Sequence, residues 1–338
     1  MKGESVILDH YQGRKAAAWI EDGRLKDLLI DADDALMPGT ILRARVDRTI
    51  KGQGGVFVTL PDGVSGYLRG VQGLAIGQSL LVQVTGFPEP GKAVPVTQKV
   101  LFKSKFAIVT PDAPGLNISR SIKDEEQRAH LRILAEDVLD GTQIGLILRS
   151  QSALGDEAEV AEDIAEMVAL AQAIHADRNG DPELLIDGPD AHHMAWREWG
   201  DPTDLETEPG AFEHRGVLDE IDLLSSSKAM FPNGGYMWIE PTRALVAVDV
   251  NSGPDISLAA TLKTNLAAAK ELPRQLRLRG LGGQVTLDLA PLAKKDRKQF
   301  ENALRNAFRA DTVETSLVGW TPLGHYELQR KRERRPLF

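Results

Sequence analysis

The sequence contains no cysteine. This absence excludes disulfides, thiolate catalysis and cysteine-ligated zinc, and it is compatible with a reducing compartment. No apolar run reaches the roughly 18 residues that a membrane span requires. The first fifteen residues, MKGESVILDHYQGRK, also lack the apolar stretch of a signal peptide. We therefore expect a cytoplasmic protein that does not interact with membranes.

The chain as a whole lacks an excess of positive charge, because 40 Lys and Arg stand against 49 Asp and Glu and the formal net charge is -9. Its distribution is nevertheless uneven. Residues 154–240 hold 4 Lys/Arg against 21 Asp/Glu, whereas residues 241–338 hold 17 against 10 and residues 39–109 hold 9 against 3. A phosphate-binding surface needs local rather than total positive charge. The two basic blocks thus indicate either such surfaces or ordinary solvated faces.

A length of 338 residues predicts two or three domains. Residues 39–109 are rich in glycine and β-branched residues. They contain five candidate strands separated by turn sequences: TILRARVDRTI, GGVFVTL, SGYLRG, SLLVQVTGF and AVPVTQKVL. Five short strands at this spacing are typical of a small closed barrel.

Two aromatic residues of this segment, Phe57 and Tyr67, occur on neighbouring candidate strands near the basic Arg69. Barrels of the OB type bind single strands by stacking bases on such rings beside a basic groove. The alternative is that both rings fill the core of the barrel.

The remainder of the chain mixes helices and strands. Apolar spacing predicts helices over residues 122–139, 155–178 and 294–311. A further helix is expected over residues 256–280, where Pro273 should kink or split it.

Two carboxylates interrupt segments that otherwise read as buried strands: Asp249 follows ALVAV, and Asp288 lies in QVTLDL. A buried carboxylate is costly unless it is paired, hydrogen-bonded or bound to a metal. On neighbouring strands the two could share one Mg²⁺, and Asn251 would project from the same face as Asp249 to contact a phosphate or water. The alternative is that Asp249 caps a turn and that Asp288 pairs with one of three arginines, Arg274, Arg277 or Arg279.

These residues resemble the bacterial ribonuclease E/G endoribonucleases. TRALVAVDVNSG is similar to the strand of that family that carries the first metal-binding Asp and a catalytic Asn, and TNLAAAKELPRQLRLRGLGGQVTLDL is similar to its helix, arginine-rich segment and second metal-binding Asp. The resemblance implies that Asp249 and Asp288 hold Mg²⁺ and that Asn251 contacts the scissile phosphate.

The resemblance extends to the earlier segments. It implies that Phe57, Tyr67 and Lys92 contact RNA, and that Arg149 and Ser150, after GLIL, bind a 5′-monophosphate. The implied fold is a multidomain α+β protein. An RNase H-like domain (residues 1–35 and 185–240) would contain an inserted OB-fold barrel (36–110) and a sensor-like domain (111–184), and a DNase I-like α/β nuclease domain (241–338) would follow.

This chain departs from the family at several points. It has no Cys-x-x-Cys link, so we expect no zinc-linked dimer, and its loop after Asn251 and its sensor segment are short. Ala290 and Pro291 replace the acidic residue usual after the second metal-binding Asp. The resemblance implies a Mg²⁺-dependent endoribonuclease that cleaves single-stranded RNA to 5′-phosphate and 3′-hydroxyl ends. The expected substrates are ribosomal RNA precursors or messenger RNA. The alternative is a non-catalytic RNA-binding protein that acts on ribosomal RNA or in ribosome assembly. For Arg149 the alternative to phosphate binding is an ion pair with a carboxylate of the acidic helix predicted over residues 155–178.

Overall fold

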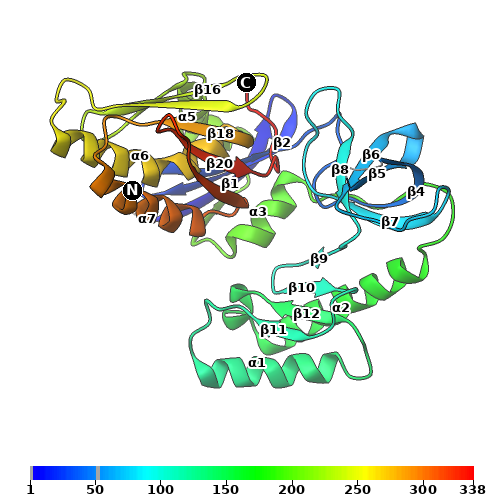
Figure 1. Ribbon diagram of the computed structural model, residues 1–338. Helices are drawn as coiled ribbons and strands as arrows, with labels where there is room; N and C mark the ends of the chain where they lie inside the picture. Colours follow the sequence, from blue (N-terminus) through cyan, green and yellow to red (C-terminus); the bar gives the residue numbers. More distant parts are fainter. Residues whose placement is uncertain (1–2, 51–53) are drawn as a thin grey trace. The chain divides into compact units, whose positions relative to one another are not determined.

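A computed structural model describes residues 3–50 and 54–338 and is mixed α and β (Figure 1). The chain divides into two compact units. We call Met1–Ile30 with Thr203–Phe338 the terminal unit, and Asp31–Pro202 the central unit. Within the described residues, no helix has the length and apolar character needed to cross a membrane.

The terminal unit contains a four-stranded sheet built from both ends of its discontinuous sequence. Its strands are β1 (Glu4–Tyr11), β2 (Arg14–Glu21), β3 (Arg24–Ile30) and β14 (Asp204–Glu206), in the order β14-β1-β2-β3. Strands β1 to β3 are antiparallel, while β14 runs parallel to β1. The turn between β2 and β3 has positive φ at Asp22 (51°) and Gly23 (74°), as an Asp-Gly hairpin turn requires. Helices α4 (Ala211–His214) and α5 (Val217–Leu224) pack on this sheet.

A second, six-stranded sheet completes the terminal unit. Its strands, in spatial order, are β15 (Lys228–Met230), β16 (Tyr236–Pro241), β17 (Val246–Asn251), β18 (Gly283–Asp288), β20 (Tyr326–Arg330) and β19 (Thr315–Trp320). Strands β17 and β18 are parallel and are connected through α6 (Leu258–Leu278). Helices α6 and α7 (Arg297–Arg309), the latter preceded by the 3-10 turn η3 (Lys294–Asp296), share one apolar core with this sheet (Figure 1).

Helix α6 continues through Pro273, so of the two expected effects of this proline, a kink or a split, the split does not occur. Proline inside a helix costs about 3 kcal/mol. The buried face of α6 offsets that cost, since Ala268, Ala269, Leu272 and Leu276 all lie in the core beneath the helix. Ser257 caps the helix by accepting a hydrogen bond from the backbone N–H of Ala260.

The central unit contains the predicted barrel. Its strands are β4 (Ile41–Ile50), β5 (Gly55–Thr59), β6 (Ser65–Arg69), β7 (Ser79–Val84) and β8 (Val94–Thr97), with the 3-10 turn η1 (Pro61–Gly63) between β5 and β6. They are ordered β4-β5-β6-β8-β7, and pairing of β7 with β4 closes the barrel. This is an OB-like arrangement, with β6 and β8 as its parallel pair. Strand β13 (Glu183–Ile186) extends the sheet beyond β4.

A smaller layered element follows the barrel in the central unit. Its four strands, in the order β11-β12-β10-β9, are β11 (Leu116–Ile118), β12 (Gly145–Leu148), β10 (Ala107–Thr110) and β9 (Phe102–Lys103). Helices α1 (Glu125–Val138) and α2 (Glu157–Ala176) pack against it and are capped by Asp124 and Asp156. The 3-10 turn η2 (Ser150–Ala153) and helix α3 (Ala191–Trp199) complete the unit. The finer four-domain division stays a prediction.

Candidate functional site

The two predicted metal-binding carboxylates lie side by side on the six-stranded sheet. Strands β17 and β18 are paired so that Asp249 is the register partner of Asp288. Val246, Val248 and Val250 alternate with Asp249 and face the helix-covered core. Both carboxylates therefore occupy the opposite, exposed face, and the Asp288 side chain is 68% exposed. The inference that they are buried was wrong, because only one face of each strand is covered.

Hydrogen bonds and ion pairs orient these carboxylates. Asn251 lies on the same face as Asp249 and donates a 2.9 Å hydrogen bond from Nδ2 to Asp249 Oδ2. On the other side, His325 Nε2 is 3.7 Å from Asp288 Oδ1. The pair is thus flanked by an amide and an imidazole. No sequence motif indicated the imidazole, because only the pairing of β18 with β20 brings His325 to Asp288.

None of the ion pairs among residues 3–50 and 54–338 joins Asp288 to an arginine, so that alternative is wrong. Arg274 pairs with Glu271 at 2.6 Å. Arg277 pairs with Asp27 and Asp311. Arg279 donates from Nη1 to the Leu224 carbonyl at 2.6 Å. These arginines stabilise the terminal unit and leave the Asp249–Asp288 face to other ligands.

The donor chemistry of this face fits a hard divalent cation that keeps several waters. Carboxylate oxygens are the protein ligands that Mg²⁺ prefers, and Mg²⁺ commonly binds through one or two of them while it keeps several waters. Across the described part of the chain, no group of three or more His, Cys, Asp or Glu side chains gathers as a complete cage. Asp249 and Asp288 can therefore supply two ligands, with the remaining positions left to water and substrate.

The aromatic pair of the barrel points outward. Phe57 and Tyr67 are register partners on β5 and β6, and their ring centroids are 5.2 Å apart. Neither belongs to the barrel core, which contains their neighbours Val56, Val58 and Leu68. The alternative that both rings fill the core is therefore wrong.

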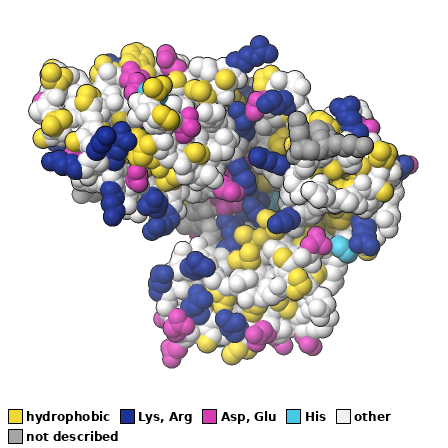
Figure 2. All heavy atoms as spheres, viewed as in Figure 1, with side chains coloured by type: hydrophobic (Ala, Val, Ile, Leu, Met, Phe, Trp, Pro, Cys, Tyr) yellow, Lys and Arg dark blue, Asp and Glu magenta, His cyan; other side chains and the backbone are white. Residues whose placement is uncertain are grey.

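The surface around the rings carries positive charge. Arg48 is the register partner of Phe57, and its Cζ lies 4.5 Å from the centroid of the Phe57 ring. No sequence pattern had indicated this arginine. Arg69 is exposed at the end of β6, whereas Lys92 lies in the β7–β8 connection and pairs with Glu89 at 2.5 Å. Figure 2 shows Lys and Arg side chains over the part of the surface that the barrel occupies in Figure 1.

Gly55 makes room for this aromatic surface. A Cβ at Gly55 would lie 2.1 Å from the hydroxyl oxygen of Tyr67, far inside van der Waals contact. Tyr67 thus lies across the glycine, and a larger residue at position 55 would displace its ring.

Arg149 follows β12, as predicted, and already has partners within the central unit. Its Nη1 donates to the carbonyls of Ser104 (2.6 Å) and Arg197 (3.1 Å), and its Nη2 pairs with Glu198 of α3. Burial of Glu198 acts to raise the pKa of its carboxyl, but the charges and hydrogen bonds of Arg197 and Arg149 have the larger combined effect and lower this pKa below its ordinary value. The carboxylate that engages Arg149 therefore comes from α3 and not from the acidic helix α2. Ser150 is exposed at the start of η2.

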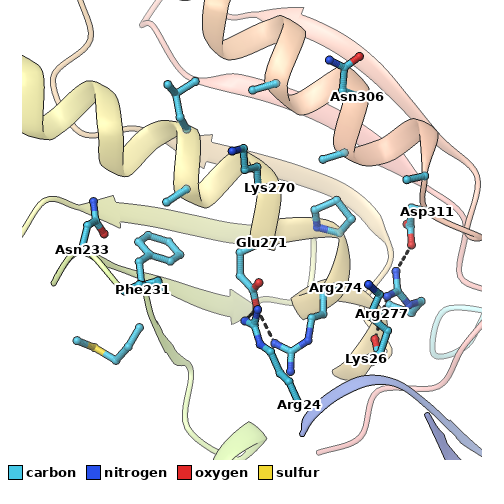
Figure 3. Close-up of a pocket in the computed structure, with 18 of the residues that line it drawn as sticks. Arg24, Lys26, Phe231, Asn233, Lys270, Glu271, Arg274, Arg277, Asn306 and Asp311 are labelled. Carbon is cyan, nitrogen blue, oxygen red and sulfur yellow. Dashed lines mark hydrogen bonds and ion pairs between the residues drawn. The ribbon is translucent and has the colours of Figure 1, made fainter. Parts of the chain in front are cut away.

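The terminal unit also contains a cavity of about 1100 Å³ on the helical side of the six-stranded sheet (Figure 3). Residues of α6, α7 and the β2–β3 hairpin line it. Arg24 and Arg274 both point to Glu271, and Arg277 points to Asp311. Its arginines are therefore neutralised by carboxylates, and the cavity does not include Asp249 or Asp288.

Most of the chain is similar in sequence to known proteins. The family model described as the Ribonuclease E/G family matches residues 102–205 and 203–333. Ribonuclease G of Escherichia coli is 27% identical, over 94% of this chain and 77% of that protein. Ribonuclease E of a Nostoc species is 28% identical, over 78% of this chain and 44% of that protein, and ribonuclease E of a Synechocystis species is 28% identical over 77% and 45%. The chain thus spans less than half the length of these two cyanobacterial relatives.

Proposed function

Since this chain belongs to the ribonuclease E/G family, we propose that it is an endoribonuclease that cleaves single-stranded RNA. The observation that carries the proposal is the pairing of Asp249 with Asp288 on adjacent parallel strands, with Asn251 hydrogen-bonded to the first of them. Three polar groups thereby converge on an open face that an extended phosphodiester can reach.

In this proposal Asp249 and Asp288 would hold Mg²⁺ through their carboxylate oxygens. When bound, the cation would supply Lewis-acid stabilisation of the charge that develops on the phosphate and would lower the pKa of a bound water. Asn251 would help to orient the Asp249 carboxylate through the 2.9 Å hydrogen bond, and its amide would contact the scissile phosphate. The products would carry a 5′-phosphate and a 3′-hydroxyl.

The OB-like barrel would bind the RNA strand. Phe57 and Tyr67 are outward-facing rings beside Arg48 and Arg69, and such rings stack bases while cations contact the phosphates. Lys92 would add a further phosphate contact once it is released from Glu89. Ribosomal RNA precursors or messenger RNA are the substrates that we propose.

The same proposal assigns a domain character to each segment. Three antiparallel strands with a fourth strand parallel to the first, β3-β2-β1-β14, support an RNase H-like domain. The six-stranded sheet with α6 and α7 would be the DNase I-like nuclease domain. Arg149 and Ser150 would form a 5′-monophosphate sensor in which the phosphate takes the place of Glu198.

The direct test is a cleavage assay on purified protein with and without Mg²⁺. A 5′-labelled single-stranded oligonucleotide is incubated with wild-type protein and with Asp249→Asn protein. We expect Mg²⁺-dependent endonucleolytic products from the wild type alone, with 3′-hydroxyl ends that a poly(A) polymerase can extend. Tight RNA binding without cleavage in any divalent cation would instead identify a non-catalytic RNA-binding protein.

A further inference from the structure

An aromatic and basic cluster lies directly beside the carboxylates on the exposed face of the six-stranded sheet. Trp238 of β16 is the register partner of Asp249, and Tyr236 is the partner of Asn251. Lys228 of β15 is in turn the partner of Trp238. One row across the face therefore reads Lys228, Trp238, Asp249 and Asp288. Neighbouring strands are about 4.8 Å apart, so Trp238 lies one strand from the first carboxylate.

The geometry of this cluster leaves an aromatic surface available. Trp238 is 37% exposed, although large aromatic side chains usually bury most of their area. Its ring meets Tyr236 edge-on, with centroids 6.3 Å apart and an interplanar angle of 89°. The two rings thus pack against each other at right angles.

A cation accompanies these rings. Lys228 Nζ lies 3.9 Å from the centroid of Tyr236 and 5.6 Å from that of Trp238. Within the part of the chain that the structure describes, Lys228 forms no ion pair with a carboxylate. An aromatic plane beside an uncompensated cation is the combination that binds single-stranded nucleic acid, because the base stacks and the phosphate meets the charge.

We propose that Trp238, braced by Tyr236 and accompanied by Lys228, forms a nucleobase-stacking subsite for the nucleotide next to the scissile phosphate. The proposal rests on the proposed function, because the ligand is an RNA strand whose phosphate lies at Asp249 and Asp288. It adds a contact that selects the cleavage position. A base stacked on Trp238 determines which phosphate of the RNA lies at Asp249 and Asp288 on the adjacent strands. The stacking does not depend on the base, since every base has an aromatic face.

The test compares intact and abasic oligonucleotides. A set of single-stranded RNAs, each lacking one base at a successive position along the whole oligonucleotide, is titrated by fluorescence anisotropy in EDTA, so that binding is measured without cleavage. The proteins are wild type, Trp238→Ala and Trp238→Phe, which keeps an aromatic face. Glu240→Ala is the matched control, because Glu240 is exposed on the same strand and face two residues further on.

We expect one position beside the cleavage site at which base removal weakens wild-type binding about ten-fold. Trp238→Ala should bind the intact RNA as weakly as wild type binds that abasic RNA, and should show no further loss at that position. Trp238→Phe should retain most of the affinity difference between intact RNA and RNA that is abasic at that position. Glu240→Ala should retain all of that difference. A cooperative thermal unfolding transition, measured for each variant, confirms that all the proteins compared are folded.

The outcomes separate this subsite from the proposed function. Equal sensitivity of wild type and Trp238→Ala to base removal at every position would overturn the subsite, even if RNA is cleaved normally. Loss of the sensitivity in Trp238→Ala would support it, even if no variant cleaves RNA, in which case the nuclease proposal alone fails. Unchanged RNA binding with an altered sedimentation coefficient would assign the face to protein contact and overturn the subsite.

Discussion

Replacement of Phe57 by alanine separates RNA binding from folding, because the ring lies outside the barrel core. Among the described residues, the ring packs against Tyr67, with centroids 5.2 Å apart, and lies 4.5 Å from the Arg48 guanidinium carbon. An aromatic pair contributes about 0.5–1.5 kcal/mol and an exposed cation–π contact about 0.5–1 kcal/mol. Phe57→Ala should therefore lower the free energy of unfolding by about 1–2.5 kcal/mol, compared with about 3–5 kcal/mol for a buried phenylalanine.

The effect on RNA binding should be large by comparison. Loss of one stacked base costs about 1–3 kcal/mol, which raises the Kd for a single-stranded oligonucleotide by about 5- to 150-fold. Urea denaturation gives the stability, and anisotropy titration gives the affinity. Val58→Ala is the matched control, because Val58 is adjacent on β5 and buried in the barrel core, so it should lose stability but keep its affinity when folded. An unfolding loss above about 3 kcal/mol with normal RNA affinity would refute the reasoning.

Two further predictions concern buried charges. Burial opposes ionisation of Asp27, but Arg334 and Arg277 prevail and hold its pKa below the ordinary 3.8. Its stabilising contribution is therefore present above about pH 4 and is lost as the pH falls through the folded-state pKa. Asp27→Asn should lower the free energy of unfolding at pH 7 by about 3–5 kcal/mol and flatten its acid dependence in urea titrations, and an unchanged acid slope would contradict this. Glu198→Gln should free Arg149 and increase the cleavage preference for 5′-monophosphate over 5′-hydroxyl RNA by about ten-fold, whereas Arg149→Ala should abolish the preference. Equal rates on 5′-monophosphate, 5′-triphosphate and 5′-hydroxyl RNA in wild-type and Glu198→Gln protein would argue against a sensor.

Local patterns in the sequence predict the elements of this fold well. The barrel strands are recognisable because Val46, Val56 and Val58 alternate with outward residues. The hairpin at Asp22-Gly23 follows from its turn chemistry. The pairing of β13 with β4 joins residues that are about 140 positions apart, as in Glu183 with Arg43, and no local periodicity encodes it. The continuity of α6 through Pro273 depends likewise on tertiary packing that overrides a local preference.

The candidate site was predictable in its residues but not in its environment. The segment VAVDVN reads as buried because Val246, Val248 and Val250 face the core, while Asp249 between them faces solvent. His325 and Trp238 meet the carboxylates only through strand register, across β18–β20 and β16–β17. His325 is distant from both carboxylates in the sequence. Trp238 precedes Asp249 in one hairpin, but only the register of β16 with β17 places its side chain beside the carboxylate.

The most direct test of the nuclease site is the Asp288→Asn variant, measured for both cleavage and binding of one single-stranded RNA in Mg²⁺. The substitution keeps the size of the side chain and removes one of the two carboxylates on the exposed face. We predict that single-turnover cleavage is abolished while the Kd for the RNA stays nearly unchanged, because binding depends mainly on the barrel. Cleavage by Asp288→Asn protein at the wild-type rate would contradict the account and place the active site elsewhere.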